Sequence, residues 1–254
     1  MKPMPAAKHF FEGPMLEVAQ AIDAGDAQRA YVLGKALGAE RLNAFGNEGL
    51  TLLKYAGYKA VPETPQQLQV ITALLRAGAD PLLKSRESNN SGSILSLAAL
   101  RAEGPARTAF LKAVLDGGVN PNAEEYYAAG EPYLFRFASQ DTPDSLKLMV
   151  ERGANVNARD TLGNSAIMEA IGVFAIDEVN YLLDCGADPK VVNTTGVSFA
   201  WKVYDKVLKQ KDDPFKRYPK VLALQERLIR AGVPWPPLSP KEMRKKLGIP
   251  EAEW

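Results

Sequence analysis

The amino-acid sequence predicts an all-α protein: a solenoid of stacked helix-turn-helix units with short hairpin-like turns. A short motif recurs along the chain, in which two apolar residues and two mostly polar ones precede a glycine and a small residue. Its clearest copies are LLRAGADP from Leu74, MVERGANV from Met149 and LLDCGADP from Leu182. Apolar residues at helical spacing precede each copy. Such internal repetition is typical of proteins whose units stack on their neighbours.

Each motif glycine is expected to end a helix, because glycine adopts the left-handed conformation without a Cβ clash. These glycines lie 33 to 46 residues apart, and the copy at Gly38 is the weakest: Gly38, Gly78, Gly118, Gly153, Gly186 and Gly232. Roughly ten to fourteen residues later a second small residue opens another helical pattern: Gly49, Gly92, Gly130, Gly163 and Gly196. About six units of turn, helix, break and helix are therefore predicted.

The C-terminal end of the sequence carries a separate helix signal. Ser239 is expected as the N-cap, Pro240 at the first helical position, Glu242 as capping-box partner and Gly248 as the stop. We therefore predict a solenoid over residues 1–238 and a capping segment over residues 239–254.

Composition excludes several classes of function. The 254 residues are 46% hydrophobic and 24% charged, as in ordinary folded proteins, and the net charge of +1 favours neither nucleic acid nor an anionic membrane. No apolar run is long enough to span a membrane, and the N-terminal residues lack the apolar segment of a secretory signal. We expect a soluble cytoplasmic protein, or a periplasmic one if a signal peptide has been removed.

The sequence offers little for catalysis. Its only histidine, His9, lies before the first unit, and its only cysteine, Cys185, excludes an internal disulfide. No metal-ligand cluster and no nucleotide-binding glycine motif is present. We predict a protein that is not an enzyme and binds no cofactor or metal. The alternative is a catalytic site in one of two insertions, KSRESNNSGS (residues 84–93) or KQKDDPFKRYP (residues 209–219), but neither is long enough to form a pocket.

Residues 153–170, GANVNARDTLGNSAIMEA, and the stretch GADPKVVNTTGVSFAW from Gly186 resemble the repeat of ankyrin-repeat proteins. The resemblance covers residues 11–235. No copy keeps the TPLH motif of the family; Ser165 to Met168 and Thr51 to Lys54 stand in its place, which predicts more purely apolar stacking.

The resemblance implies a free monomer whose concave surface, made of turn tips and first helices, binds another protein. The corresponding positions in this sequence are Phe45, Glu48, Arg86, Glu87, Glu124, Tyr126, Tyr127, Arg159, Thr161, Leu162, Asn164, Val192 and Thr194. Tyr126 and Tyr127 are the most informative, because tyrosine is enriched among residues that dominate interface energetics. Alternatively, one of these tyrosines braces its hairpin, and Phe45 packs against the end of the stack.

The chain also resembles bacterial standalone ankyrin proteins, some of which are immunity partners of secreted toxins. That resemblance implies neutralisation of a cognate antibacterial toxin, such as a type VI lipase-like effector, by occlusion of its active site. The alternative is a scaffold or regulatory adaptor in the cytoplasm. An immunity protein should have one very tight partner, whereas an adaptor should have several of moderate affinity.

Overall fold

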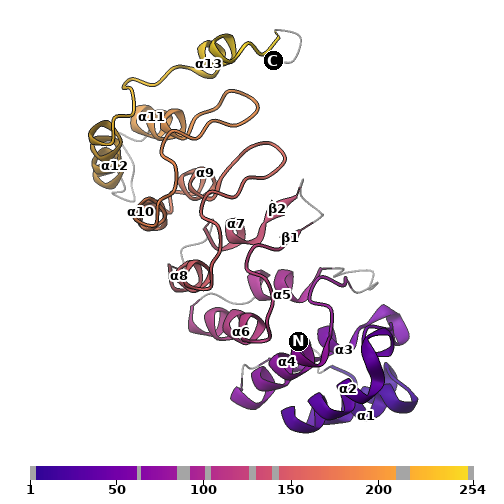
Figure 1. Ribbon diagram of the computed structural model, residues 1–254. Helices are drawn as coiled ribbons and strands as arrows, with labels where there is room; N and C mark the ends of the chain where they lie inside the picture. Colours follow the sequence, from indigo (N-terminus) through magenta and orange to yellow (C-terminus); the bar gives the residue numbers. More distant parts are fainter. Residues whose placement is uncertain are drawn as a thin grey trace. The chain divides into compact units, whose positions relative to one another are not determined.

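The computed structural model describes residues 4–61, 64–84, 92–100, 104–125, 130–138, 143–209 and 218–250. The chain divides into two compact units, residues 1–121 (unit 1) and residues 122–254 (unit 2). Both are built from successive antiparallel helix pairs, and the all-α repeat fold predicted from the sequence is confirmed (Figure 1).

Unit 1 contains three helix pairs preceded by a short 3-10 turn. Its elements are η1 (Ala7–His9), α1 (Gly13–Ala24), α2 (Ala27–Leu42), η2 (Asn47–Gly49), α3 (Leu52–Lys59), α4 (Pro65–Ala77), α5 (Ile94–Leu100) and α6 (Pro105–Asp116). The first helices pack in the order α1, α3, α5 and the second helices in the order α2, α4, α6. Ile22, Ile71, Leu74 and Phe110 are fully buried, so each pair covers the apolar face of its neighbour.

Unit 2 repeats this arrangement and ends in a single helix. Its elements are β1 (Glu124–Glu125), β2 (Glu131–Pro132), α7 (Tyr133–Ala138), α8 (Pro143–Glu151), α9 (Ala166–Gly172), α10 (Ile176–Asp184), α11 (Phe199–Lys209), α12 (Tyr218–Arg230) and α13 (Pro240–Leu247). The short strands β1 and β2 pair antiparallel, and α7, α9 and α11 pack in that order beside α8, α10 and α12.

The motif glycines behave as predicted at five of the six positions. Each lies at the end of a helix with a φ between 75° and 111°: Gly78, Gly118, Gly153, Gly186 and Gly232. Gly38 is different, because it lies inside α2 with φ 75° and ψ 160° and one more helical turn follows it, up to Leu42. The second helix of this pair ends at its C-cap Asn43 instead, and Gly25 ends the first helix, α1, in the left-handed conformation.

The C-terminal helix α13 begins and ends with the predicted chemistry. The Ser239 side chain accepts the Glu242 backbone N–H, the Glu242 carboxylate accepts the Ser239 N–H, and Gly248 ends α13 with φ 69°. The helix lies against the hairpin of residues 192–198, where Arg244 Nη1 donates to the carbonyl oxygen of Thr195 over 3.0 Å.

The expectation of purely apolar stacking does not hold at Lys54, one of the residues in place of the TPLH motif. Its side chain is buried, and Nζ donates to the carbonyl oxygen of Gly92 over 2.6 Å. Gly92 belongs to the next helix pair of unit 1, so a lysine supplies a polar link between neighbours. A buried ammonium requires such a partner, because burying an unpaired charge is costly.

Candidate protein-binding surface

Two hairpin tips of unit 2 carry most of the predicted contact positions that the structure describes. In the hairpin of residues 159–165, the Asp160 carboxylate accepts the backbone N–H groups of Leu162 and Asn164 over 2.9 and 2.8 Å. In the hairpin of residues 192–198, the Asn193 side chain accepts those of Thr195 and Val197 over 3.1 and 2.9 Å. Asp and Asn stabilise tight turns in this way, so both tips are held by local hydrogen bonds.

The two hairpins are also bonded to each other. The backbone N–H and the hydroxyl of Thr194 both donate to the carbonyl oxygen of Leu162, each over 2.9 Å. Asn193 Nδ2 donates to Asn164 Oδ1 over 3.0 Å, and Arg159 Nη1 donates to the carbonyl oxygen of Val192 over 2.9 Å. Arg159, Asn164 and Thr194 therefore help to build this surface.

Exposure separates the tip residues into two groups. Arg159, Thr161, Leu162 and Thr194 are exposed, whereas Asn164 and Val192 are half-buried. Leu162 is 51% exposed although it is a large apolar residue. A large apolar side chain is thus left open to solvent on a turn held by hydrogen bonds. We call the exposed group, Arg159, Thr161, Leu162 and Thr194, the hairpin surface.

Of the remaining predicted positions, Glu124 lies close to the hairpin residue Thr161: both flank Gly130, where an added Cβ would be 3.6 Å from Glu124 Oε2 and 3.4 Å from Thr161 Cγ2. Glu124 is exposed in β1, opposite Pro132 of β2. Arg86, Glu87, Tyr126 and Tyr127 lie outside the described residues. The tyrosine contact therefore stays a prediction.

In unit 1, Glu48 is bonded to the N-terminal segment. Its Oε1 lies 2.8 Å from His9 Nε2, and its own backbone is left-handed with φ 59°. Nearby, Phe45 is half-buried. Glu48 is thus exposed, but it already has a partner within the chain.

An aromatic row in unit 2 was not among the predicted positions. The ring of Tyr204 lies between those of Trp201 and Trp235, at centroid distances of 5.7 and 5.5 Å, and all three side chains are half-buried. The spacing of Trp201 and Tyr204 places both on one face of α11. Trp235 could not be added from the sequence, because it follows α12 and reaches Tyr204 only through the tertiary fold.

No group of three or more His, Cys, Asp and Glu side chains in the described ranges is placed to hold a metal ion. Burial and a hydrogen bond to Cys185 raise the pKa of Tyr181 to about 12, so this phenol is a poor proton acceptor or donor near neutral pH. No helix in the part of the chain that the structure describes is both long and apolar enough to cross a membrane.

Solved structures with a similar fold are ankyrin-repeat proteins. The ankyrin repeat domain of Bcl-3, a member of the IkappaB protein family, is 21% identical with a TM-score of 0.59, and the match covers 86% of each chain. The ankyrin repeat protein EF0377 is 21% identical with a TM-score of 0.56, over 84% of this chain and 98% of that one. An ankyrin repeat domain from Acinetobacter baumannii AYE, ABAYE2397, is 20% identical with a TM-score of 0.57, over 85% and 97%.

No protein-family model and no curated protein sequence matches the chain. The structural similarities establish its fold, which is that of an ankyrin-repeat protein.

Proposed function

We propose that the chain is a non-catalytic protein-binding module whose partner contacts the hairpin surface and the adjoining first helices of unit 2. The observation that carries this proposal is the exposure of Leu162 and Thr161 on hairpins that are already bonded to each other. A fixed turn loses little conformational freedom on binding, so its contacts contribute more of their energy to affinity. Repeat folds of this kind commonly bind partners through such extended surfaces.

The test compares two exposed apolar positions on the same helix pair. The tagged chain, its Leu162→Asp variant and its Val173→Asp variant are used to capture partners, and the affinity of each captured protein is then measured by calorimetry. Val173 is also 51% exposed, but it follows α9 at the end opposite the hairpin. We expect Leu162→Asp to weaken binding at least about tenfold and Val173→Asp to have little effect. Equal binding by all three proteins would contradict the proposal.

A finer proposal concerns the kind of partner. From the resemblance to bacterial standalone ankyrin proteins, we propose that the partner is a secreted antibacterial toxin of the type VI lipase-like class, whose active site the chain occludes. In size-exclusion chromatography the chain alone should elute as a monomer, and with its cognate toxin it should form a tight complex of one copy of each protein. The lipase activity of the toxin should be lost in this complex. Several partners of moderate affinity and no inhibition would instead favour a scaffold or regulatory adaptor.

A further proposal concerns the cellular compartment of the protein. We propose the cytoplasm for the sequence as it stands, and the periplasm if a longer precursor carries a signal peptide. Fractionation of cells that produce the native gene product, followed by immunodetection, distinguishes the two.

A further inference from the structure

A second feature suited to binding lies at the C-terminal end of unit 2. A groove of about 580 Å³ opens between the hairpin of residues 192–198, the segment of residues 232–238 and α13. None of the hairpin-surface residues Arg159, Thr161, Leu162 and Thr194 lines it. The groove is therefore distinct from the hairpin surface, although Val192 and the α11 residue Ala200 belong to the wider surface proposed above.

The groove is lined mainly by apolar side chains that are left open to solvent. Leu238 is 38% exposed and Leu247 is 53% exposed. Met243 and Leu247 are four residues apart, so they share one face of α13, and no residue of this helix is buried. An apolar helix face that its own fold leaves uncovered is typical of an interaction site.

The position of α13 beside the hairpin is set by contacts at Arg244 and Gly196. Its capping box and the left-handed Gly248 define its ends, and Arg244 bonds to the carbonyl oxygen of Thr195. The backbone of Gly196 lies so close to α13 that an added Cβ would be 2.7 Å from Arg244 Cγ and 2.9 Å from the Pro240 oxygen. The hairpin backbone and α13 are thus in close contact on this side of the helix.

Two lysines give the groove a positive rim. Lys190 and Lys246 line it, and among the described residues neither ammonium group has an ion-pair partner. The nearest carboxylates in sequence are already engaged. Asp188 accepts the backbone N–H of Lys190 over 2.8 Å, and Glu242 accepts the side-chain and backbone groups of Ser239, which lower its pKa. A ligand carboxylate would therefore meet unpaired positive charge.

The register of the repeats explains why the space exists. In the preceding junction, the side chain of Asn157, four residues after a motif glycine, bonds to the next turn at Gly186 and Asp188. Lys190 occupies the same position after Gly186, and no hydrogen bond among the described residues joins its side chain to the turn at Gly232. Within the described ranges, the turn at Gly232 therefore lacks the side-chain hydrogen bonds that join Asn157 to the turn at Gly186 and Asp188.

We propose that this groove binds a short segment of a partner protein that inserts apolar side chains between Leu238 and Leu247 and sets a carboxylate beside Lys190 and Lys246. The charge of the rim favours an acidic segment over a basic one. The apolar walls require at least one large side chain for appreciable affinity.

The experiment uses a random dodecapeptide phage library selected against the immobilised full chain. Enriched peptides are synthesised with a fluorescent label, and their Kd values are measured by anisotropy at low and high salt. We expect peptides that combine apolar residues with Asp or Glu. Leu247→Asp should weaken them at least about tenfold, and Lys190→Glu with Lys246→Glu should weaken them about tenfold at low salt but less at high salt. Val32→Asp, at an exposed valine of unit 1, is the matched control and should have no effect.

Several results would overturn the proposal. These are no enrichment over the Leu247→Asp variant, a preference for basic peptides, or peptides that bind the Leu247→Asp variant as tightly as the wild type. Peptides that lose affinity with Leu162→Asp alone would assign binding to the hairpin surface and remove it from the groove. A failure to find a protein partner for the hairpin surface would leave a positive peptide result intact.

Two further measurements test other occupants. A dimer that forms on concentration and is lost in Leu247→Asp, seen by sedimentation equilibrium, would make a second copy the occupant. A chain ended at Pro250 that binds the peptides much more tightly than the full chain would make residues 251–254 the occupant. We expect neither, and either one would contradict a partner segment.

Discussion

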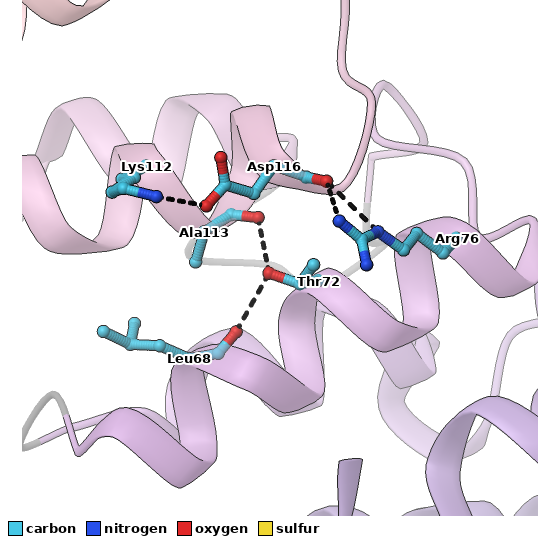
Figure 2. A network of polar contacts seen from close by, with 6 residues as sticks. All are labelled: Leu68, Thr72, Arg76, Lys112, Ala113 and Asp116. Carbon is cyan, nitrogen blue, oxygen red and sulfur yellow. Dashed lines mark hydrogen bonds and ion pairs between the residues drawn. The ribbon is translucent and has the colours of Figure 1, made fainter. Parts of the chain in front are cut away.

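Two junctions between neighbouring second helices, one in each unit, are joined in different ways. In the junction between α8 and α10 of unit 2, the Asn157 side chain donates to the carbonyl oxygen of Gly186 and accepts the N–H of Asp188, over 3.0 and 2.8 Å. In the junction between α4 and α6 of unit 1, side chains of the second helix make the link (Figure 2). There Thr72 Oγ1 donates to the carbonyl oxygen of Ala113 over 2.8 Å, and Arg76 donates twice to that of Asp116.

The difference follows from one residue in each turn. Asn43 and Asn122 make the same two bonds as Asn157. Each donates to the carbonyl oxygen of the next motif glycine and accepts the backbone N–H two residues after it. The position four residues after Gly78 is Leu82, which has no polar side chain, and this is the junction where Thr72 and Arg76 cross. Position 190 also lacks asparagine, and there Arg227 of α12 bonds to Asn180 and Asp184 of α10. The carbonyl groups near a helix end need donors, and a different element supplies them when the turn does not.

The largest loss of stability is predicted for a substitution that creates a steric clash in the junction between α4 and α6 of unit 1. At Gly117, the end of α6, an added Cβ would lie 2.5 Å from Leu75 Cδ1 and 2.6 Å from Leu75 Cβ. Gly117→Ala should therefore lower the free energy of unfolding by about 1–3 kcal/mol, measured by urea denaturation. Gly172→Ala is the control, because nothing lies within 4 Å of its added Cβ and its φ is not left-handed. Equal losses in both variants would contradict close packing of α6 on α4.

The second prediction breaks the asparagine junction of unit 2. Asn157→Ala removes both bonds to the turn at Gly186 and Asp188, so a loss of about 1–2 kcal/mol in the free energy of unfolding is expected. Asn157→Asp keeps an acceptor for Asp188 but loses the donor to Gly186, and should fall between the wild type and Asn157→Ala. If both variants unfold at the wild-type urea concentration, the asparagine does not hold the junction.

A third variant breaks the unit 1 junction by removing one hydroxyl. Thr72→Val keeps the shape of the side chain but leaves the Ala113 carbonyl oxygen without this donor (Figure 2). We expect a loss of about 1 kcal/mol, since the group is half-buried. Thr161→Val is the control at an exposed hairpin tip and should leave stability unchanged. A Thr72→Val variant as stable as the control would show that Arg76 alone suffices.

The smallest effect is expected at Arg76, which is exposed. Arg76→Met keeps the aliphatic part of the side chain and removes both bonds to the Asp116 carbonyl oxygen, so the free energy of unfolding should fall by no more than about 0.5 kcal/mol. Differential scanning calorimetry of Arg76→Met, Thr72→Val and the double variant measures how strongly the contributions of these two side chains to stability depend on each other. If Arg76→Met lowered the free energy of unfolding more than Asn157→Ala does, the expected ranking of the two variants would be wrong.

Short-range signals account for the parts of the fold that were predicted correctly. Gly78 and Gly153 end helices because left-handed backbone favours glycine wherever it occurs. Ser239 and Glu242 form their capping box because the two residues are three positions apart on any helix start. The turn at residues 159–165 was placed for the same reason, since Asp160 bonds to backbone groups two and four residues away.

Predictions that needed the position of a distant residue were wrong or were not made. The sequence around Gly38 resembles the motif that ends a helix elsewhere in the chain. In the structure, however, one more helical turn follows Gly38 and includes Leu42, which is buried in unit 1. The burial of Lys54 depends on Gly92, and the aromatic row depends on Trp235 meeting Tyr204. Nothing within a few residues of these positions encodes such contacts.

The sequence by itself determined the repeat, the turn at five of the six repeat glycines and the start and end of the last helix, because these depend on backbone preferences over a few residues. Tertiary structure decided which side chains join one helix pair to the next, and it left the groove beside Leu247 open. Those outcomes depend on the packing of residues about 30 to 50 positions apart, whose distance in space only the folded chain defines.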